Sequence, residues 1–209
     1  MTIRLVILGG FLGSGKTSVL IPLAKEIIEA EGGPDGTTKV AIIENEIGQV
    51  GIDTAFTEDT GLYTTELFNG CVCCSIAGSL MDSLAKMEEE MHPAWVILET
   101  TGLARPGDVA AQLREYYDEN MDITIFNILD SRRWLKLVPV VGTLIDDQVE
   151  AADYVLMNKI DTTDAETLDK VEAGAKAKTK GKIFRISAAE DPEGTAAVCK
   201  EIIAEIQNK

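Results

Sequence analysis

Histidine and positive charge are both scarce in this sequence. It holds a single histidine, His92, and its 19 basic residues stand against 35 acidic ones, for a net charge of −16. The lone histidine excludes a histidine-rich metal-binding tract. The excess of negative charge repels phosphate backbones and anionic lipid, so nucleic acids and membrane surfaces are poor candidate partners. Any phosphate group that this protein binds must therefore be held by local geometry.

Cysteines and long apolar runs are also few. The sequence has four cysteines, with Cys71, Cys73 and Cys74 together and Cys199 alone, which is no disulfide framework and suits a reducing compartment. No apolar run is as long as a membrane span. The apolar N-terminus leads into a glycine loop without the basic leader and cleavage site of a signal peptide. These absences predict a cytoplasmic protein, and a length of 209 residues predicts a single domain over residues 1–209.

Short apolar runs alternate with amphipathic stretches along the chain. The apolar runs are β-rich and bounded by turn or polar residues, as expected for strands buried on both faces of a parallel sheet. They are Ile3–Leu8, Val40–Ile43, Trp95–Leu98, Ile123–Leu129, Tyr154–Met157 and Ile183–Ile186. Helical spacing predicts helices at Ser18–Ala30, Ser75–Met91, Asp108–Glu119, Ala165–Ala177 and Thr195–Gln207. The alternation predicts a three-layer α/β fold, a mostly parallel sheet flanked by helices. The polar stretch from Glu44 to Thr65 is hard to assign.

A glycine-rich motif follows the first predicted strand. Residues Gly10–Thr17 fit the pattern G-x-x-x-x-G-K-[ST] between a strand and a helix, the context that a P-loop requires. Backbone N–H groups of such a loop surround phosphate oxygens, and the helix N-terminus adds a favourable dipole. We expect Lys16 to contact the β- and γ-phosphates and Thr17 to bind Mg²⁺. The sequence thus predicts a P-loop NTPase fold, with Gly10, Gly13, Ser14, Gly15, Lys16, Thr17 and Ser18 at the nucleotide.

A second motif, Glu99-Thr100-Thr101-Gly102, follows the Trp95–Leu98 run. An acidic residue at the end of a buried strand is where a P-loop enzyme holds its Mg²⁺, often through water. The glycine can place a backbone N–H near the γ-phosphate and move when that phosphate leaves. We therefore predict Glu99 as a magnesium and catalytic residue together with Lys16 and Thr17, and Gly102 as a nucleotide contact.

A third motif, Asn158-Lys159-Ile160-Asp161, follows the Tyr154–Met157 run. A carboxylate here can accept two hydrogen bonds from the N1–H and the 2-amino group of guanine, a donor pair that adenine lacks. Asp161 could instead be an ordinary helix N-cap. The order of strand, N-K-x-D and P-loop favours guanine recognition. Asn158, Lys159 and Asp161 are thus predicted base contacts, and Ser187 and Ala188 could close over the base.

The cysteine cluster is the remaining feature that carries chemistry. Neighbouring cysteines such as Cys73 and Cys74 make a strained disulfide. Thiolates suit Zn²⁺ or another soft or borderline ion better than Mg²⁺. The cluster therefore favours a transition-metal site, while a structural or redox role for the thiols stays open.

In combination these motifs resemble the CobW-type metallochaperone GTPases, within the wider group that includes the hydrogenase and urease nickel-insertion GTPases. The matching blocks follow the family's order over nearly the whole chain. They are Gly10–Thr17, Asn45–Asp53, Asn69–Cys74, Glu99–Pro106, Gln148 with Ala152 and Asp153, and Asn158–Asp161.

The resemblance implies a GTP-binding and GTP-hydrolysing metallochaperone, or a maturation protein for a metalloenzyme or corrinoid protein. Its cofactors would be GTP or GDP, Mg²⁺ and a transition metal, Zn²⁺ or Co²⁺. That metal would lie on Cys71, Cys73 and Cys74, with Glu44, water or a partner as a further ligand. Residues 44–53 look like the family's first switch. The resemblance also allows a nucleotide- or metal-dependent homodimer.

Three departures from the family pattern limit these expectations. Gln49 stands where many members have glutamate, the histidine-rich tract is missing, and the chain looks like a short form without the C-terminal domain. An alternative is therefore a GTP-controlled interaction switch for a client such as a corrinoid methyltransferase, with structural or redox-active cysteines. A small-molecule kinase is disfavoured, because kinases have no need of N-K-x-D.

Overall fold

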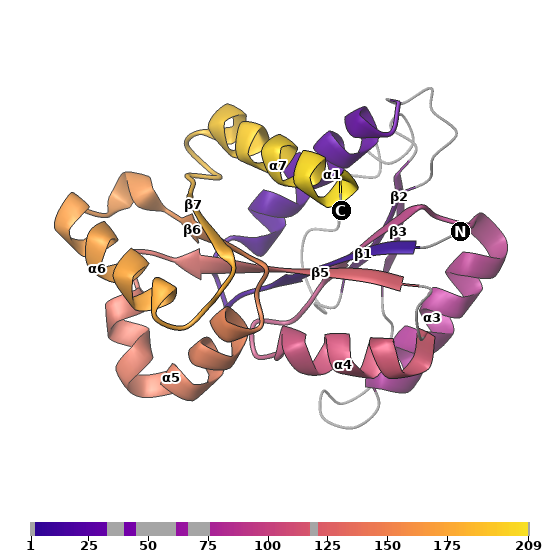
Figure 1. Ribbon diagram of the computed structural model, residues 1–209, viewed down its shortest axis with the longest axis horizontal. Coiled ribbons are helices and arrows are strands. Elements are labelled where there is room, and N and C mark those ends of the chain that lie inside the picture. Colours follow the sequence, from indigo (N-terminus) through magenta and orange to yellow (C-terminus); the bar gives the residue numbers. More distant parts are fainter. Residues whose placement is uncertain (1–2, 33–39, 45–61, 67–75, 118–120, 209) are drawn as a thin grey trace.

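The protein is a layered α/β structure whose strands and helices alternate along the chain (Figure 1). The computed structural model describes residues 3–32, 40–44, 62–66, 76–117 and 121–208. The strands are β1 Ile3–Gly9, β2 Val40–Glu44, β3 Leu62–Glu66, β4 Trp95–Glu99, β5 Met121–Asp130, β6 Tyr154–Asn158 and β7 Lys182–Arg185. The helices are α1 Lys16–Ala30, α3 Ile76–Met91, α4 Pro106–Tyr117, α5 Trp134–Glu150, α6 Ala165–Lys176 and α7 Pro192–Gln207, with a 3₁₀ turn, η2, at Ile160–Thr162.

One seven-stranded sheet forms the middle layer, in the order β3-β2-β4-β1-β5-β6-β7. Every pairing between its strands is parallel. Helices α1 and α7 cover one face, and α3, α4, α5 and α6 cover the other (Figure 1). The predicted three-layer architecture is therefore confirmed.

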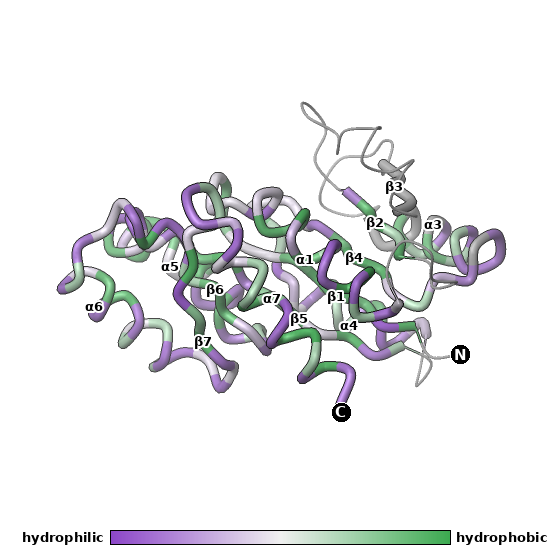
Figure 2. The backbone as a smooth tube through the Cα atoms, turned by 90° about the horizontal axis from the view of Figure 1, so that it is seen from above, coloured by the Kyte–Doolittle hydropathy of each residue, from purple (hydrophilic) through white to green (hydrophobic). Residues whose placement is uncertain are grey.

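The strand sequences explain why both faces are covered. Successive side chains of a strand point to opposite faces, so Leu5 and Ile7 pack under α3–α6 while Val6 and Leu8 pack under α1 and α7. These four side chains are at most 1% exposed. Burying each contributes about 1.5–3 kcal/mol relative to exposure. Figure 2 shows hydrophobic stretches of the backbone, in green, in the middle of the molecule.

Two elements were not predicted from the sequence, and one was described wrongly. Strand β3 lies inside the stretch left unassigned, and α5 contains Pro139 and a non-helical residue, Val141, at φ −128° and ψ 28°. The kink interrupts the helical periodicity that a sequence pattern relies on. Among the described residues strand β7 pairs only with β6, at the edge of the sheet, and its residues are half-buried or exposed instead of buried on both faces.

The carboxyl ends of the strands meet at one edge of the sheet. Strand β1 lies between β4 and β5, so the chain leaves β1 toward one side of the sheet and later crosses to the other. Ligands of open parallel sheets bind at this kind of switch point. The loops after β1, β4, β5, β6 and β7 all emerge there. None of the helices in the described ranges is long and apolar enough to cross a membrane.

Candidate nucleotide-binding site

The loop after β1 folds as a tight turn built on glycines. Gly10, Gly13 and Gly15 have φ values of 137°, 71° and 99°, a region that favours glycine. A Cβ on Gly10 would lie 2.3 Å from the Ile128 carbonyl oxygen, and one on Gly15 would lie 2.4 Å from Nδ2 of Asn158. The backbone therefore approaches its neighbours as closely as a phosphate cradle requires.

The side chains at the start of α1 suit a phosphate and a hard cation. Lys16 is 5% exposed, and its ammonium lies 3.3 Å from the Gly10 carbonyl oxygen. Thr17 donates its hydroxyl to Oε1 of Glu99 at 3.0 Å, and Glu99 is buried at the end of β4. A hydroxyl and a carboxylate in contact, beside a phosphate loop, are the oxygen ligands that Mg²⁺ takes. The residues present therefore fit a magnesium ion. Ser18 is exposed in the first turn of α1.

The segment after Glu99 packs directly on the phosphate loop. A Cβ on Gly102 would lie 2.6 Å from the backbone nitrogen of Leu12 and 2.7 Å from its Cα. Gln148 of α5, 1% exposed, donates to the carbonyl oxygens of Ala104 at 2.8 Å and Gly102 at 3.3 Å. The predicted γ-phosphate segment is thus fixed between the phosphate loop and α5.

Asn158 connects the phosphate loop with the loops after β6 and β7. Its Nδ2 donates to the Ser14 carbonyl oxygen at 2.9 Å, and its Oδ1 accepts from the backbone N–H of Lys159 at 2.8 Å and of Ala188 at 3.0 Å. Asn158 is 3% exposed. One amide therefore holds together three segments that the sequence predicts at the nucleotide.

The two other residues of the N-K-x-D motif also have partners. The Lys159 ammonium donates to the carbonyl oxygen of Gly13, and Lys159 has a left-handed φ of 65°. Ser187 donates its hydroxyl to the Asp161 carboxylate. The structure thus brings together the predicted phosphate, magnesium and base residues at one edge of the sheet.

Two residues at this end of the sheet, Asp130 and Arg133, are not predicted from the sequence as parts of the site. Asp130, the last residue of β5, has a side chain 1% exposed, and its Oδ2 lies 2.8 Å from Lys159 Nζ and 2.7 Å from Arg133 Nε. Burial opposes the charge, but hydrogen bonds from Lys159 and Arg133 outweigh it and lower the pKa of Asp130. Asp130 ends a buried apolar strand as Glu99 does, so the same signal could have found it.

The predicted transition-metal residues are only partly described. Cys71, Cys73, Cys74 and Gln49 lie outside the described residues. Glu44 ends β2 and is the register partner of Glu99 on β4. No group of three or more histidine, cysteine or acidic side chains able to hold a metal occurs within the described residues.

The fourth cysteine differs from the cluster. Cys199 is fully buried in α7, and burial raises the pKa of its thiol to about 12. It therefore stays protonated at neutral pH and makes a poor metal ligand.

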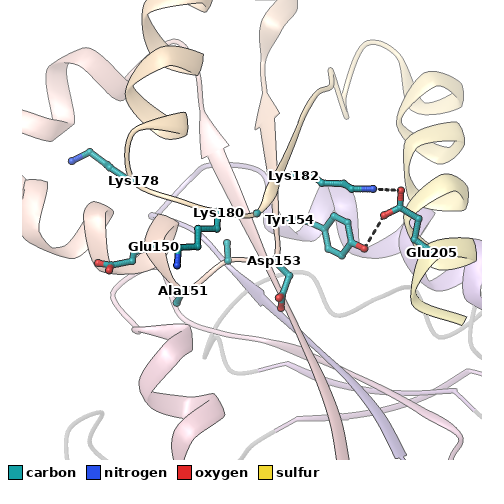
Figure 3. A pocket seen from close by; sticks show the side chains of 10 residues that line it. Glu150, Ala151, Asp153, Tyr154, Lys178, Lys180, Lys182 and Glu205 are labelled. Carbon is teal, nitrogen blue, oxygen red and sulfur yellow. Dashed lines mark hydrogen bonds and ion pairs between the residues drawn. The ribbon is translucent and has the colours of Figure 1, made fainter. Parts of the chain in front are cut away.

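A pocket of about 560 Å³ lies where β6 and β7 begin, at the amino ends of the strands and thus at the opposite end from the nucleotide site (Figure 3). Lys182 and Tyr154 both reach Glu205, with the Tyr154 hydroxyl donating at 3.0 Å. Burial, then Glu205, raises the pKa of Tyr154 to about 12, so its hydroxyl stays neutral. Three lysines face three carboxylates in this lining, namely Lys178, Lys180, Lys182, Glu150, Asp153 and Glu205. The opposite charges balance, and the lining contains no residue of the phosphate loop, of the Glu99–Gly102 motif or of the N-K-x-D motif.

Sequence comparison places the chain among known proteins. The family model "CobW/HypB/UreG, nucleotide-binding domain" matches residues 4–185. The zinc chaperone YeiR of Escherichia coli (strain K12) is 32% identical over 166 residues, which are 78% of this chain and 48% of that protein. The zinc-regulated GTPase metalloprotein activator 1 of Schizosaccharomyces pombe is 31% identical over 182 residues, 81% of this chain and 42% of that protein. The chain spans about half the length of the curated relatives it matches.

Structural comparison agrees on the fold. The crystal structure of Zn(II)-bound YjiA GTPase from E. coli matches with a TM-score of 0.64 at 21% identity, over 96% of this chain and 62% of that one. The family model covers nearly all of the sheet and every motif of the nucleotide site. The chain therefore belongs to the CobW/HypB/UreG family of P-loop GTPases.

Proposed function

We propose that this chain is a GTP-hydrolysing metallochaperone that binds a transition metal at Cys71, Cys73 and Cys74. Binding and release of the metal follow the state of the nucleotide. The observation that carries the coupling is the pairing of Glu44 with Glu99 across β2 and β4, while Glu99 accepts the hydroxyl of Thr17. Paired strands lie about 4.8 Å apart. Glu44, a proposed ligand of the transition metal, is therefore the neighbour of Glu99, a proposed ligand of Mg²⁺.

Hydrolysis in this proposal depends on electrostatic stabilisation of the transferring phosphoryl group. Lys16 and the loop amides face the phosphates, and Thr17 and Glu99 hold Mg²⁺. When bound, Mg²⁺ supplies charge that stabilises the phosphoryl oxygens. The loop geometry matters more than usual here, because the net charge of −16 opposes an anionic ligand.

Base recognition falls to the loops after β6 and β7. Asp161 would accept the N1–H and 2-amino hydrogens of guanine, with Lys159 along the base. Ser187 already donates to one oxygen of the Asp161 carboxylate. That contact supports the proposal, because it orients the carboxylate at the mouth of the site without using both oxygens.

The metal is Zn²⁺ in this proposal, since three thiolates suit it and curated relatives carry the name zinc chaperone. Co²⁺ is the competing cargo, and it would connect the protein to corrinoid maturation. The client is a metalloenzyme or corrinoid protein of the cytoplasm. Switch residues that follow Glu44 directly in sequence would loosen the thiolate site on hydrolysis.

Anaerobic titration of Zn²⁺ and Co²⁺ tests the proposal. The proteins are the wild type, a Cys71→Ser/Cys73→Ser/Cys74→Ser variant and the matched control Cys199→Ser, whose thiol is buried and protonated. Each is titrated against a chromogenic chelator with GDP and with a non-hydrolysable GTP analogue. We expect one tight site in the wild type and the control, and a loss of at least about 100-fold in the triple variant, or about 2.7 kcal/mol.

Two results would decide against the metallochaperone. Equal metal affinity of the wild type and the triple variant would remove the cysteines from the metal site. That result together with nucleotide-dependent binding of a client would favour the interaction switch instead. Tight thiolate binding that is the same with GDP and the GTP analogue would leave a metal site but remove its coupling to the nucleotide.

A further inference from the structure

Two cations anchored on one buried carboxylate hold consecutive carbonyls of the phosphate loop. Lys159 and Arg133 both contact Oδ2 of Asp130, at 2.8 and 2.7 Å. The Lys159 ammonium donates to the Gly13 carbonyl oxygen, and Nη2 of Arg133 donates to the Leu12 carbonyl oxygen at 2.5 Å. Lys159 belongs to the N-K-x-D motif, whereas Arg133, at the start of α5, belongs to none of the sequence motifs.

We propose that Arg133 is a positioning residue of the phosphate loop, which fixes the Leu12–Gly13 peptide in the orientation that GTP hydrolysis needs. A trans peptide is planar, so its C=O and N–H point to opposite sides. When Arg133 holds the Leu12 carbonyl on the outer side, the N–H of Gly13 faces the phosphate cradle. Within the described part of the chain that N–H donates no hydrogen bond, so it is available for a phosphate oxygen.

This peptide needs an external support because its own residues provide little. Leu12 is 57% exposed, so its side chain contributes little packing, and Gly102 lies against its N and Cα, on the N-terminal side of the residue. Gly13 can adopt both hands of φ at little cost. The guanidinium also lies against Gly13, since a Cβ there would be 3.2 Å from Nη2 of Arg133. A flip of the peptide would therefore meet the guanidinium.

The geometry requires arginine and not only a positive charge. Nε of Arg133 is used by Asp130 while Nη2 reaches Leu12 in another direction, and the Arg133 backbone N–H also donates to Oδ1 of Asp130 at 3.1 Å. A planar guanidinium makes both side-chain contacts at once from a rigid fork. A lysine at this position would keep the ion pair with Asp130 and lose the hold on the loop.

The reaction step that depends on this orientation is the departure of the γ-phosphoryl group. Negative charge builds up on the leaving diphosphate in the transition state, and a fixed N–H donor there stabilises charge that bound GTP does not yet carry. Arg133 should therefore affect turnover more than GTP affinity. The inference rests on the proposed GTP hydrolysis but not on the metal site.

The test compares Arg133→Lys and Arg133→Ala with Arg132→Ala, an exposed neighbour of equal charge. We expect kcat for GTP to fall about 10- to 100-fold in both Arg133 variants, below the loss of about 10²–10³ for removal of a donor. The Kd for a non-hydrolysable GTP analogue should change less than about threefold by the same argument, and Arg132→Ala should match the wild type. Arg133→Lys retains the Asp130 ion pair, so it stays folded if Arg133→Ala does not.

Hydrogen exchange of residues 10–15 with GDP bound gives a second, independent measurement. Both Arg133 variants should exchange faster there than Arg132→Ala. Full turnover by Arg133→Lys would show that charge alone suffices and would overturn the inference. If the wild type hydrolyses no GTP, the proposed function fails, and unchanged exchange in the Arg133 variants would then reject the positioning role by itself.

Discussion

Replacement of Gln148 by methionine tests the contact between α5 and the segment after Glu99. The change keeps the length and volume of the side chain and removes the amide that donates to Ala104 at 2.8 Å and to Gly102 at 3.3 Å. Gln148 is 1% exposed, Gly102 is buried and Ala104 is half-buried, so water has little access to the Gly102 carbonyl oxygen and only partial access to that of Ala104. Each buried acceptor left without a partner costs about 1–3 kcal/mol, and the longer bond falls at the low end.

The sum predicts a loss of roughly 2–4 kcal/mol in the free energy of unfolding. For a chain of this size that corresponds to a decrease in Tm of about 5–15 °C. Urea unfolding followed by tryptophan fluorescence measures it directly, because Trp95 and Trp134 are both buried and report on the core. The matched control is Gln112→Met, an exposed position on α4.

A difference below about 0.5 kcal/mol between Gln148→Met and Gln112→Met would refute the reasoning, since exposed substitutions fall in that range. It would mean that the segment relaxes and finds other hydrogen-bond partners. A full loss of stability with unchanged hydrolysis would instead mean that Gln148 supports the fold and not the γ-phosphate segment.

Three further predictions concern the carboxylates of the site. Glu99→Gln should lower kcat for GTP about 100-fold and weaken its dependence on Mg²⁺, with GDP binding in chelator unchanged; an unaltered Mg²⁺ titration would contradict the assignment. Asp161→Asn should weaken GTP binding at least about 100-fold, as measured in an equilibrium binding assay with ATP as the comparison nucleotide. Equal affinity of the wild type for GTP and ATP would refute guanine recognition. The lowered pKa of Asp130 stabilises the fold above its ordinary value of 3.8 and ceases to do so as pH falls through the folded pKa. The stability advantage of the wild type over Asp130→Asn should therefore be full at pH 7 and shrink in acid unfolding below about pH 4; a constant difference would disagree.

The nucleotide site could be predicted from the sequence where its chemistry is local. The phosphate loop uses backbone groups of consecutive residues, so glycine spacing together with Lys16 and Thr17 predicts it. Asn158 is equally predictable, since it stands directly after an apolar run and ends β6. The sequence predicts Thr17 and Glu99 as ligands of one Mg²⁺, and in the structure the two side chains form a hydrogen bond.

Arg133 and Gln148 show what the sequence could not provide. Whether a residue after β5 reaches the phosphate loop depends on which strand lies beside β1, and periodicity does not give strand order. Gln148 belongs to a block that resembles the family, but its contact with Gly102 depends on the path of α5 past the kink at Val141. Tertiary packing decides both contacts.

Two elements of the fold escaped prediction for physical reasons of the same kind. Strand β3 reads Leu-Tyr-Thr-Thr-Glu, a short segment at the end of the strand order that pairs, in the part of the chain that the structure describes, with β2. Its tyrosine and threonines favour a strand, but five residues without alternation of apolar and polar side chains give no periodic signal, and only the pairing with β2 reveals the strand. Helix α5 contains Pro139 and is kinked at Val141, as local propensity suggests. Its two parts are kept as helix by packing on the sheet, through Trp134 before the kink and Ile145 after it.

The place of β1 in the sheet has a consequence for how the protein folds during its synthesis. Its two neighbours are β4 and β5, which end at residues 99 and 130. At ordinary translation speeds β5 is completed on the order of ten seconds after β1. The phosphate loop is thus among the first segments to be synthesised and among the last to be finished, because its bond to Asn158 comes later still. A nucleotide that binds only the finished loop would stabilise completed chains over nascent ones, so guanine nucleotide should raise the yield of native protein in refolding.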